Sequence, residues 1–216
     1  MIKNSNYLKH ILDSYKYKRE EIKARLKEFE KVGEEGDERI FTELCFCILT
    51  PQSKAKVCDS AVQNLVKTNM LFEGTAEEIR LYLAGVRFPN NKARYISEAR
   101  KLFTARGGLK IKDEMGSFDD DRELRRWLVS KIRGLGYKEA SHFLRNIGRG
   151  ADLAILDRHI LKNLTLLGVI DEEKAVSNKA YLEIESRMLQ FSKEVNISLA
   201  ELDFLLWSEE TGEIFK

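Results

Sequence analysis

The stretch Lys131–Gly148, which reads KIRGLGYKEASHFLRNIG, decides the fold that we expect for this chain. An amphipathic segment, Glu123–Arg133, runs into the tripeptide GLG, and a second helical segment follows immediately. Gly134 and Gly136 can take positive φ and allow a partner to approach the backbone closely. Free N–H groups and the dipole at the start of the second helix favour an anion such as a phosphate. The stretch therefore predicts two helices joined by a tight turn, either a plain connection or a phosphate-binding hairpin.

Basic side chains are concentrated around this turn. Positions 131–162 contain seven lysines and arginines against three acidic residues, whereas the whole chain has a net charge of only +2. Lys138 falls in the first turn of the second helical segment, and Asp157 precedes a later segment with helical apolar spacing. A local basic surplus of this kind indicates a surface that contacts nucleic acid.

This combination resembles the helix-hairpin-helix DNA glycosylase superfamily, in which a lysine follows the glycine hairpin and an aspartate lies in a later h-D-x-H segment. Two further stretches are similar to that family: Ile48–Ser53, after its first buried helix, and Gly85–Ala93, which reads GVRFPNNKA. The length, the missing iron–sulfur cysteines and the ending with Trp207 and Lys216 look closest to archaeal-type 8-oxoguanine DNA glycosylase/lyases. Arg133 departs from relatives such as endonuclease III, which carry proline there, and this difference should not affect the chemistry.

Composition and periodicity favour a folded, all-α protein. The chain has 216 residues, 43% hydrophobic and 33% charged, which is typical of a globular protein with a sizeable core. Because apolar residues recur at helical spacing and no segment alternates as a strand does, we expect roughly ten helices. The resemblance implies two helical subdomains with the helix-hairpin-helix motif at the cleft. The central bundle would comprise residues 36–148, with the motif at about 123–148, and the second subdomain residues 1–35 plus 149–216.

Several helices can be placed by their residues alone. Tyr7–Val32 and Lys92–Phe103 each have one apolar face. Ile40–Leu49 is apolar on nearly all sides, which indicates a helix buried in a bundle, although a short strand would read similarly. Thr75 and Ser198 are each followed three positions later by glutamate, and both predict capping boxes at helix starts.

Lys138 and Asp157 are the candidate catalytic residues. A free lysine is protonated at neutral pH, since its ordinary pKa is about 10.4, and only an uncharged amine can attack carbon. A helix start, partial burial and neighbouring cations would each favour the uncharged amine of Lys138. The resemblance implies that this amine attacks C1′ of a damaged nucleotide and forms a Schiff base, while Asp157 stays ionised and assists. From spacing alone, an exposed first-turn lysine and a helix-capping aspartate are the alternatives.

The resemblance also nominates residues that would hold the DNA. Gly134 and Gly136 would bind the backbone phosphates. Gln52 occupies the position where relatives insert a wedge into the gap that a flipped nucleotide leaves. A surface glutamine in a turn is the alternative for Gln52.

Three residues are candidates for recognising the flipped base. Phe88 and Trp207 are the aromatic candidates by resemblance, and core packing is the alternative for both. Lys216, which resembles the residue that helps to contact the lesion in the archaeal-type family, could instead be part of a fraying tail.

The sequence favours no metal centre and no membrane contact. There are three cysteines, Cys45, Cys47 and Cys58, and this odd number, with two of them in an apolar helical segment, favours reduced thiols in a cytosolic protein. They form no C-x-x-C pair, which argues against a zinc or cluster site. We expect no cofactor, apart from a monovalent cation that the hairpin carbonyls could hold. No apolar run reaches the roughly 18 residues of a membrane span, and Met1–His10 lacks the apolar core of a secretory signal. We therefore expect a monomer in the cytoplasm, associated with the nucleoid in a prokaryote.

The expected function is that of a bifunctional DNA repair enzyme. It would excise 8-oxoguanine from double-stranded DNA through a lysine Schiff base and cleave the abasic site by β-elimination. An oxidised-pyrimidine glycosylase of the endonuclease III kind is the alternative chemistry, against which the missing cluster cysteines speak. A non-catalytic helix-hairpin-helix DNA-binding protein would need neither Lys138 nor Asp157. An all-α protein-interaction domain would leave the basic hairpin unexplained.

Overall fold

The computed structural model describes residues 4–105, 107–171 and 177–216. Within these residues the chain forms twelve α-helices and one two-stranded antiparallel hairpin. The elements are α1 (Ser5–Glu34), α2 (Asp37–Leu49), α3 (Ala55–Lys67), α4 (Met70–Glu73), α5 (Ala76–Leu81), α6 (Pro89–Phe103), β1 (Thr104–Ala105), β2 (Gly108–Leu109), α7 (Ile111–Gly116), α8 (Asp121–Lys131), α9 (Tyr137–Asn146), α10 (Arg158–Leu167), α11 (Asn178–Val195) and α12 (Leu199–Thr211).

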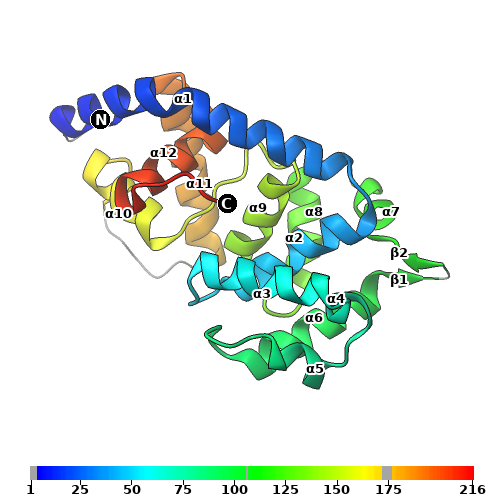
Figure 1. Ribbon diagram of the computed structural model, residues 1–216. Helices are drawn as coiled ribbons and strands as arrows, with labels where there is room; N and C mark the ends of the chain where they lie inside the picture. Colours follow the sequence, from blue (N-terminus) through cyan, green and yellow to red (C-terminus); the bar gives the residue numbers. More distant parts are fainter. Residues whose placement is uncertain (1–3, 106, 172–176) are drawn as a thin grey trace.

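The longest helix, α1, runs along the whole molecule and packs against both the C-terminal and the central helices. Figure 1 shows α1 in blue along one side, with α10–α12 beside its first half and α2 and α9 beside its second half. It packs against α12, α9 and α10. The first helix thus lies next to the last one. Through α1, the C-terminal helices α10 and α12 are also joined to the central helices α2 and α9.

Helix α2 forms the centre of the fold. All residues from Ile40 to Leu49 are buried, and α2 packs against α3, α6, α7 and α9. The prediction of a buried helix at Ile40–Leu49 is confirmed. An all-round apolar helix needs neighbours on every side, so this segment organises the bundle.

Buried apolar side chains form two clusters. One contains Val32 and residues from Ile40 to Leu153. The other combines α1 residues such as Ile11 with residues from Ala154 to Leu206. This arrangement supports our proposal of two subdomains, one of them assembled from both ends of the chain.

The structure differs from the expectations in local detail. Thr104–Ala105 and Gly108–Leu109 form a short antiparallel pair, in which Thr104 pairs with Leu109, where the sequence showed no strand. Two short helices, α4 and α7, raise the number above roughly ten. Both capping boxes are confirmed: Glu78 accepts the Thr75 amide at 2.7 Å, and Glu201 accepts that of Ser198 at 3.1 Å.

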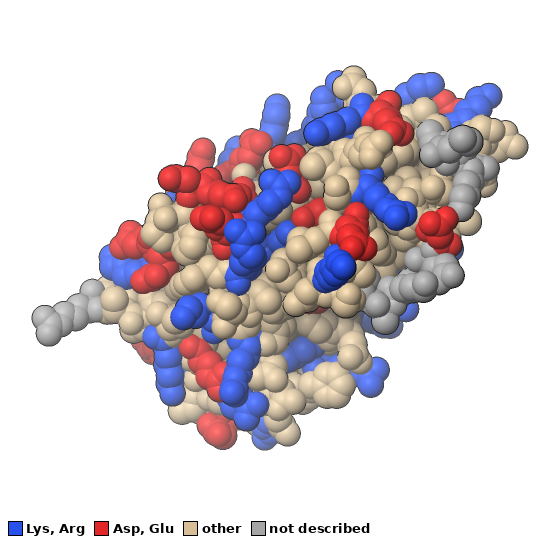
Figure 2. Space-filling view, turned by 180° about the vertical axis from the view of Figure 1, so that it is seen from behind, with Lys and Arg blue, Asp and Glu red and all other residues tan. Residues whose placement is uncertain are grey.

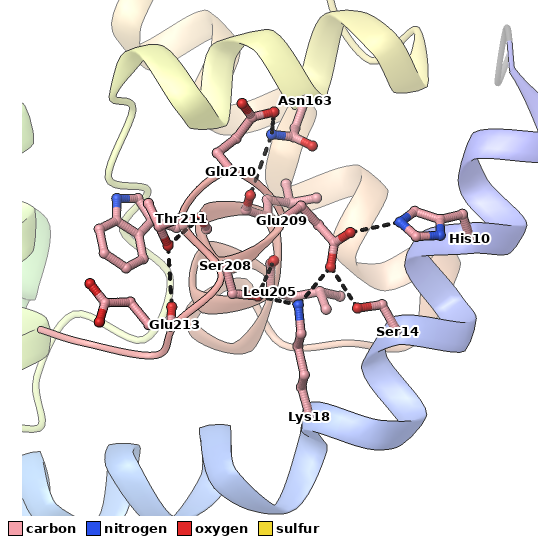
Figure 3. Close-up of polar contacts among 12 residues, drawn as sticks. His10, Ser14, Lys18, Asn163, Leu205, Ser208, Glu209, Glu210, Thr211 and Glu213 are labelled. Carbon is pink, nitrogen blue, oxygen red and sulfur yellow. Dashed lines mark hydrogen bonds and ion pairs between the residues drawn. The ribbon is translucent and has the colours of Figure 1, made fainter.

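A polar clamp joins α12 to α1. Figure 3 shows the carboxylate of Glu209 facing His10, Ser14 and Lys18. His10 Nε2 lies 2.7 Å from Glu209 Oε2, while Ser14 Oγ and Lys18 Nζ donate to Oε1 at 2.5 and 2.8 Å. Burial raises the pKa of Glu209, but the hydrogen bonds from these donors outweigh it and the pKa is lowered. The clamp fixes α12, which carries Trp207.

Charged side chains of both signs cover the surface. Figure 2 shows lysine and arginine interspersed with aspartate and glutamate over the face opposite to that of Figure 1. Among the helices of the described residues, none has the length and apolar character needed to cross a membrane.

Candidate active site

A cavity of about 770 Å³ lies where the two apolar clusters meet. Its walls come from α9, α10, α12, the loop before α3, the loop before α6 and the C-terminal segment. The volume is that of a ligand pocket for a group as large as a nucleobase. The candidate residues on its wall are Gln52, Lys138, Asp157, Trp207 and Lys216.

The glycine hairpin begins α9 at the edge of this cavity. Gly134 has a φ of 81°, and a Cβ on it would lie 2.5 Å from the Tyr95 ring, so the close approach there requires glycine. The expectation of positive φ at Gly136 is wrong, because Gly136 is the extended N-cap of α9 with a φ of −93°. Its amide donates to Glu139 Oε2 at 3.2 Å, so Glu139 already caps the helix.

Lys138 lies in the first turn of α9 and reaches the cavity from there. Its side chain is 28% exposed, and Nζ lies 3.2 Å from Glu139 Oε1. Gly134 and Gly136 do not line the cavity themselves. The hairpin therefore places the amine at the cavity wall while its glycines face outward.

Asp157 is the N-cap of α10 and also lines the cavity. Its Oδ1 accepts the amides of His159 and Ile160 at 2.8 and 2.9 Å. Both bonds go to one carboxylate oxygen, and Oδ2 has no hydrogen bond from any residue that the structure describes. The helix cap fixes the carboxylate on the cavity wall without using all of its acceptor capacity.

A buried ion pair between Arg145 and Asp203 lines the cavity behind Lys138 and Asp157. Arg145 Nη1 donates to Asp203 Oδ2, and the guanidinium lies 5.5 and 4.3 Å from the ring centroids of Phe29 and Phe204. Burial raises the pKa of Asp203 to about 6, against the attraction of Arg145, and the charge of Asp157 adds to the rise. Asp203 was not among the predicted site residues, although a single carboxylate within the otherwise apolar stretch Leu202–Trp207 of α12 is a usable signal.

Lys92 supports the loop that carries Gln52 through hydrogen bonds. Gln52 is exposed, has a φ of 56° and lies at the cavity. The buried Nζ of Lys92 donates to the carbonyls of Leu49 and Pro51, each at 2.7 Å, and to Ser53 Oγ at 3.0 Å. Burial lowers the pKa of Lys92. Lys92, in the GVRFPNNKA segment, is thus the residue that shapes this turn.

The three base-recognition candidates occupy different places. Trp207 is partly buried and lines the cavity. Phe88 lies outside the cavity wall, 51% exposed on the loop before α6, so core packing of Phe88 is excluded.

The C-terminal residue is well anchored. Lys216 Nζ lies 3.1 Å from Glu43 Oε1, 2.7 Å from Asp59 Oδ1 and 4.6 Å from the Phe46 ring centroid. These three contacts fix the side chain, so Lys216 is not part of a fraying tail. Lys216 also lines the cavity.

The cavity rim carries unpaired positive charge. Six of the lining side chains are lysine or arginine and two are aspartate. Lys54, Arg87 and Arg158 are exposed and make no ion pair with any residue that the structure describes. Such a rim attracts phosphate groups. No group of three or more His, Cys, Asp or Glu side chains in the described ranges could hold a metal ion.

The chain is similar to known DNA repair proteins over nearly its whole length. A family profile described as 8-oxoguanine DNA glycosylase matches residues 22–197. The 8-oxoguanine DNA glycosylase/AP lyase of Fusobacterium nucleatum is 46% identical over 100% of both chains. That of Korarchaeum cryptofilum is 43% identical over 92% of this chain and 91% of its own.

A solved structure has the same fold. The Methanocaldococcus jannaschii 8-oxoguanine glycosylase/lyase, crystallised with a 15mer DNA containing 8-oxoguanine, superposes with a TM-score of 0.86 at 36% identity. The match covers 96% of this chain and 100% of that one. With its family profile, relatives and fold in agreement, this chain belongs to the 8-oxoguanine DNA glycosylase family.

Proposed function

We propose that this protein excises 8-oxoguanine from double-stranded DNA and then cleaves the abasic site, with Lys138 as the nucleophile. The observation that carries the proposal is the placement of Lys138 and Asp157 on one cavity whose rim holds unpaired cations. A hydrolytic glycosylase or a plain DNA-binding module needs no lysine at that place.

The reaction begins when the unprotonated Nζ of Lys138 attacks C1′ of the extruded nucleotide. The bond from C1′ to the base nitrogen breaks, its electron pair leaves with the base, and the base takes up a proton. The attacking amine loses one proton, and the bond from C1′ to the ring oxygen breaks as that oxygen takes up a proton, which opens the sugar ring and leaves a protonated Schiff base between Nζ and C1′. Removal of a proton from C2′ then expels the 3′ phosphate oxygen, and water hydrolyses the imine to release the enzyme.

Asp157 supports this chemistry by its fixed negative charge. Positive charge develops on the sugar as the base departs, and a carboxylate held by two amide donors needs no rearrangement to stabilise it. The Lys138–Glu139 contact has to open before the attack, because a paired ammonium has no lone pair to donate.

The remaining candidates bind DNA around this centre. The Gly134–Gly136 hairpin and the rim cations hold the phosphates, and Gln52 fills the gap in the duplex. Trp207 and Lys216 contact the base, while Phe88, outside the cavity, stacks on exposed bases of the duplex. The protein acts on DNA in the cytoplasm, at the nucleoid in a prokaryote.

Borohydride trapping on a duplex with 8-oxoguanine opposite cytosine tests the proposal. The wild type should give a covalent adduct, and Lys138→Gln should give none while remaining folded. Lys179→Gln, an exposed lysine outside the cavity, is the matched control and should trap normally. An adduct formed only with thymine glycol would show an oxidised-pyrimidine enzyme. The absence of any adduct would leave a DNA-binding protein.

A further inference from the structure

His142 lines the cavity and has one buried ring nitrogen without a hydrogen-bond partner among the described residues. It lines the cavity on α9, with 8% of the residue exposed. Its Nε2 is buried and makes no hydrogen bond within the described part of the chain. Buried polar atoms without a partner are rare in folded proteins and call for an explanation such as a missing ligand.

The position of His142 relative to Lys138 suggests what that ligand is. The two residues are four positions apart on α9, so they share one face of the helix. Four residues advance the helix by about 6 Å, which places the imidazole one turn deeper than the amine. The sugar C1′ must meet Lys138 Nζ during the reaction. The base attached to that carbon then extends inward, toward His142.

The ring is uncharged at neutral pH. Burial, reinforced by the positive charges of Arg145 and Lys138, holds the pKa of His142 well below its usual value. A neutral imidazole has one N–H donor and one acceptor, and a purine edge offers a complementary group to whichever of them Nε2 carries. A hydrogen bond between the ring and the main chain of Lys216 opposes this lowering of the pKa without reversing it, and the C-terminal segment walls this part of the cavity.

Packing alone does not require a histidine here. The imidazole meets the Phe46 ring edge-on, with centroids 5.6 Å apart, a contact that another aromatic side chain could make. What histidine adds to an aromatic ring at this site is its two nitrogens. Keeping an unpaired buried nitrogen destabilises the free protein, which is consistent with a function in the complex.

We propose that His142 is a specificity-determining residue that hydrogen-bonds through a ring nitrogen to the edge of the extruded 8-oxoguanine base. This inference rests on the proposed function, since it concerns the base that Lys138 displaces. It assigns His142 to reading the base and gives it no part in the attack on the sugar.

The test uses one variant and two substrates. His142→Phe keeps a flat ring of similar size against Phe46 but removes both nitrogens. Because it removes a buried unpaired polar atom together with the hydrogen bond to the Lys216 main chain, its melting temperature should stay close to that of the wild type. Single-turnover excision of 8-oxoguanine should fall about 10- to 100-fold, as expected for one lost hydrogen bond to substrate. Cleavage of a duplex that already contains an abasic site should stay at the wild-type rate, because no base is present to be read.

Two results would overturn the inference. Excision at the wild-type rate by His142→Phe would show that the nitrogens are not used. An equal loss on both substrates, in folded protein, would show that His142 acts by positioning Lys138. If His142→Phe does not fold, His142→Gln, which keeps a donor and an acceptor, is measured on the same substrates and should retain more excision than His142→Leu. A wild-type protein inactive on both duplexes would instead remove the proposed function itself.

Discussion

Two buried arginine–carboxylate pairs cross between the apolar clusters, and they are built differently. Arg125 of α8 donates to both oxygens of Glu185 on α11, at 2.5 and 2.7 Å, and the same carboxylate accepts the amide of Ala154 at 2.8 Å. Arg145 of α9 contacts a single oxygen of Asp203 on α12. The first pair lies outside the cavity wall and the second forms part of it.

The difference separates a structural pair from a functional one. The Arg125 guanidinium also lies near the rings of Tyr137 and Tyr181, at 4.9 and 5.8 Å from their centroids, and only its Nε is unpaired. Both oxygens of Glu185 are therefore already hydrogen-bonded within the protein. Around Arg145, in contrast, Asp203 has a raised pKa and one oxygen without a hydrogen bond among the described residues, so this oxygen can accept one from substrate.

Asp157→Asn should have the largest effect at the cavity and almost none on the fold. Asparagine caps a helix about as well as aspartate, so stability should change by less than about 0.5 kcal/mol. Loss of the negative charge should reduce single-turnover excision by about 100- to 10,000-fold, with DNA binding retained. Excision near the wild-type rate in this variant would mean that Asp157 only caps α10 and has no part in the reaction.

Arg125→Met should show the reverse pattern, with the fold affected first. Removing one partner leaves the buried charge of Glu185 unpaired, which should lower the free energy of unfolding by about 3–5 kcal/mol in urea titrations. Excision per folded molecule should be unchanged below the melting temperature. A variant as stable as the wild type would contradict the role of this pair.

The pH dependence of stability should distinguish Asp203 from the first pair. Its pKa is raised to about 6 by burial, whereas the unfolded chain has the ordinary value of about 3.9. Stability linked to the protonated carboxyl is thus fully present below about pH 4 and lost as the pH rises through about 6.

The stability difference between wild type and Asp203→Asn should therefore fall by about 2–3 kcal/mol across that window. Urea titrations at several pH values measure it, with Arg125→Met as the reference variant. A difference that stays constant or grows with pH would mean that the attraction of Arg145 outweighs burial and keeps the pKa of Asp203 from rising.

The smallest effect is expected at the cavity rim. Arg158→Ala should weaken DNA binding and lower the slope of log affinity against log salt by about 0.9, the value for one phosphate contact. Lys179→Ala, outside the cavity, should leave the slope unchanged. Equal slopes for wild type and Arg158→Ala would place the phosphates elsewhere.

Local sequence signals predicted much of the fold because they act over one or two helical turns. The apolar stretch Ile40–Leu49 predicted its own burial, and Thr75 and Ser198 predicted their capping boxes. The strands Thr104–Ala105 and Gly108–Leu109 were not predicted, since two-residue strands have no room for an alternating pattern.

By itself, the sequence determined the helical class, the hairpin before α9 and the candidacy of Lys138 and Asp157, because spacing and charge along the chain carry that information. Only the tertiary structure decided that Asp203 and His142, from separate helices, share one cavity with them. It also decided that Phe88 lies outside this cavity, and that Lys92 shapes the Gln52 turn. These facts depend on how distant helices pack, since burial and long-range pairing arise only when the whole chain is folded.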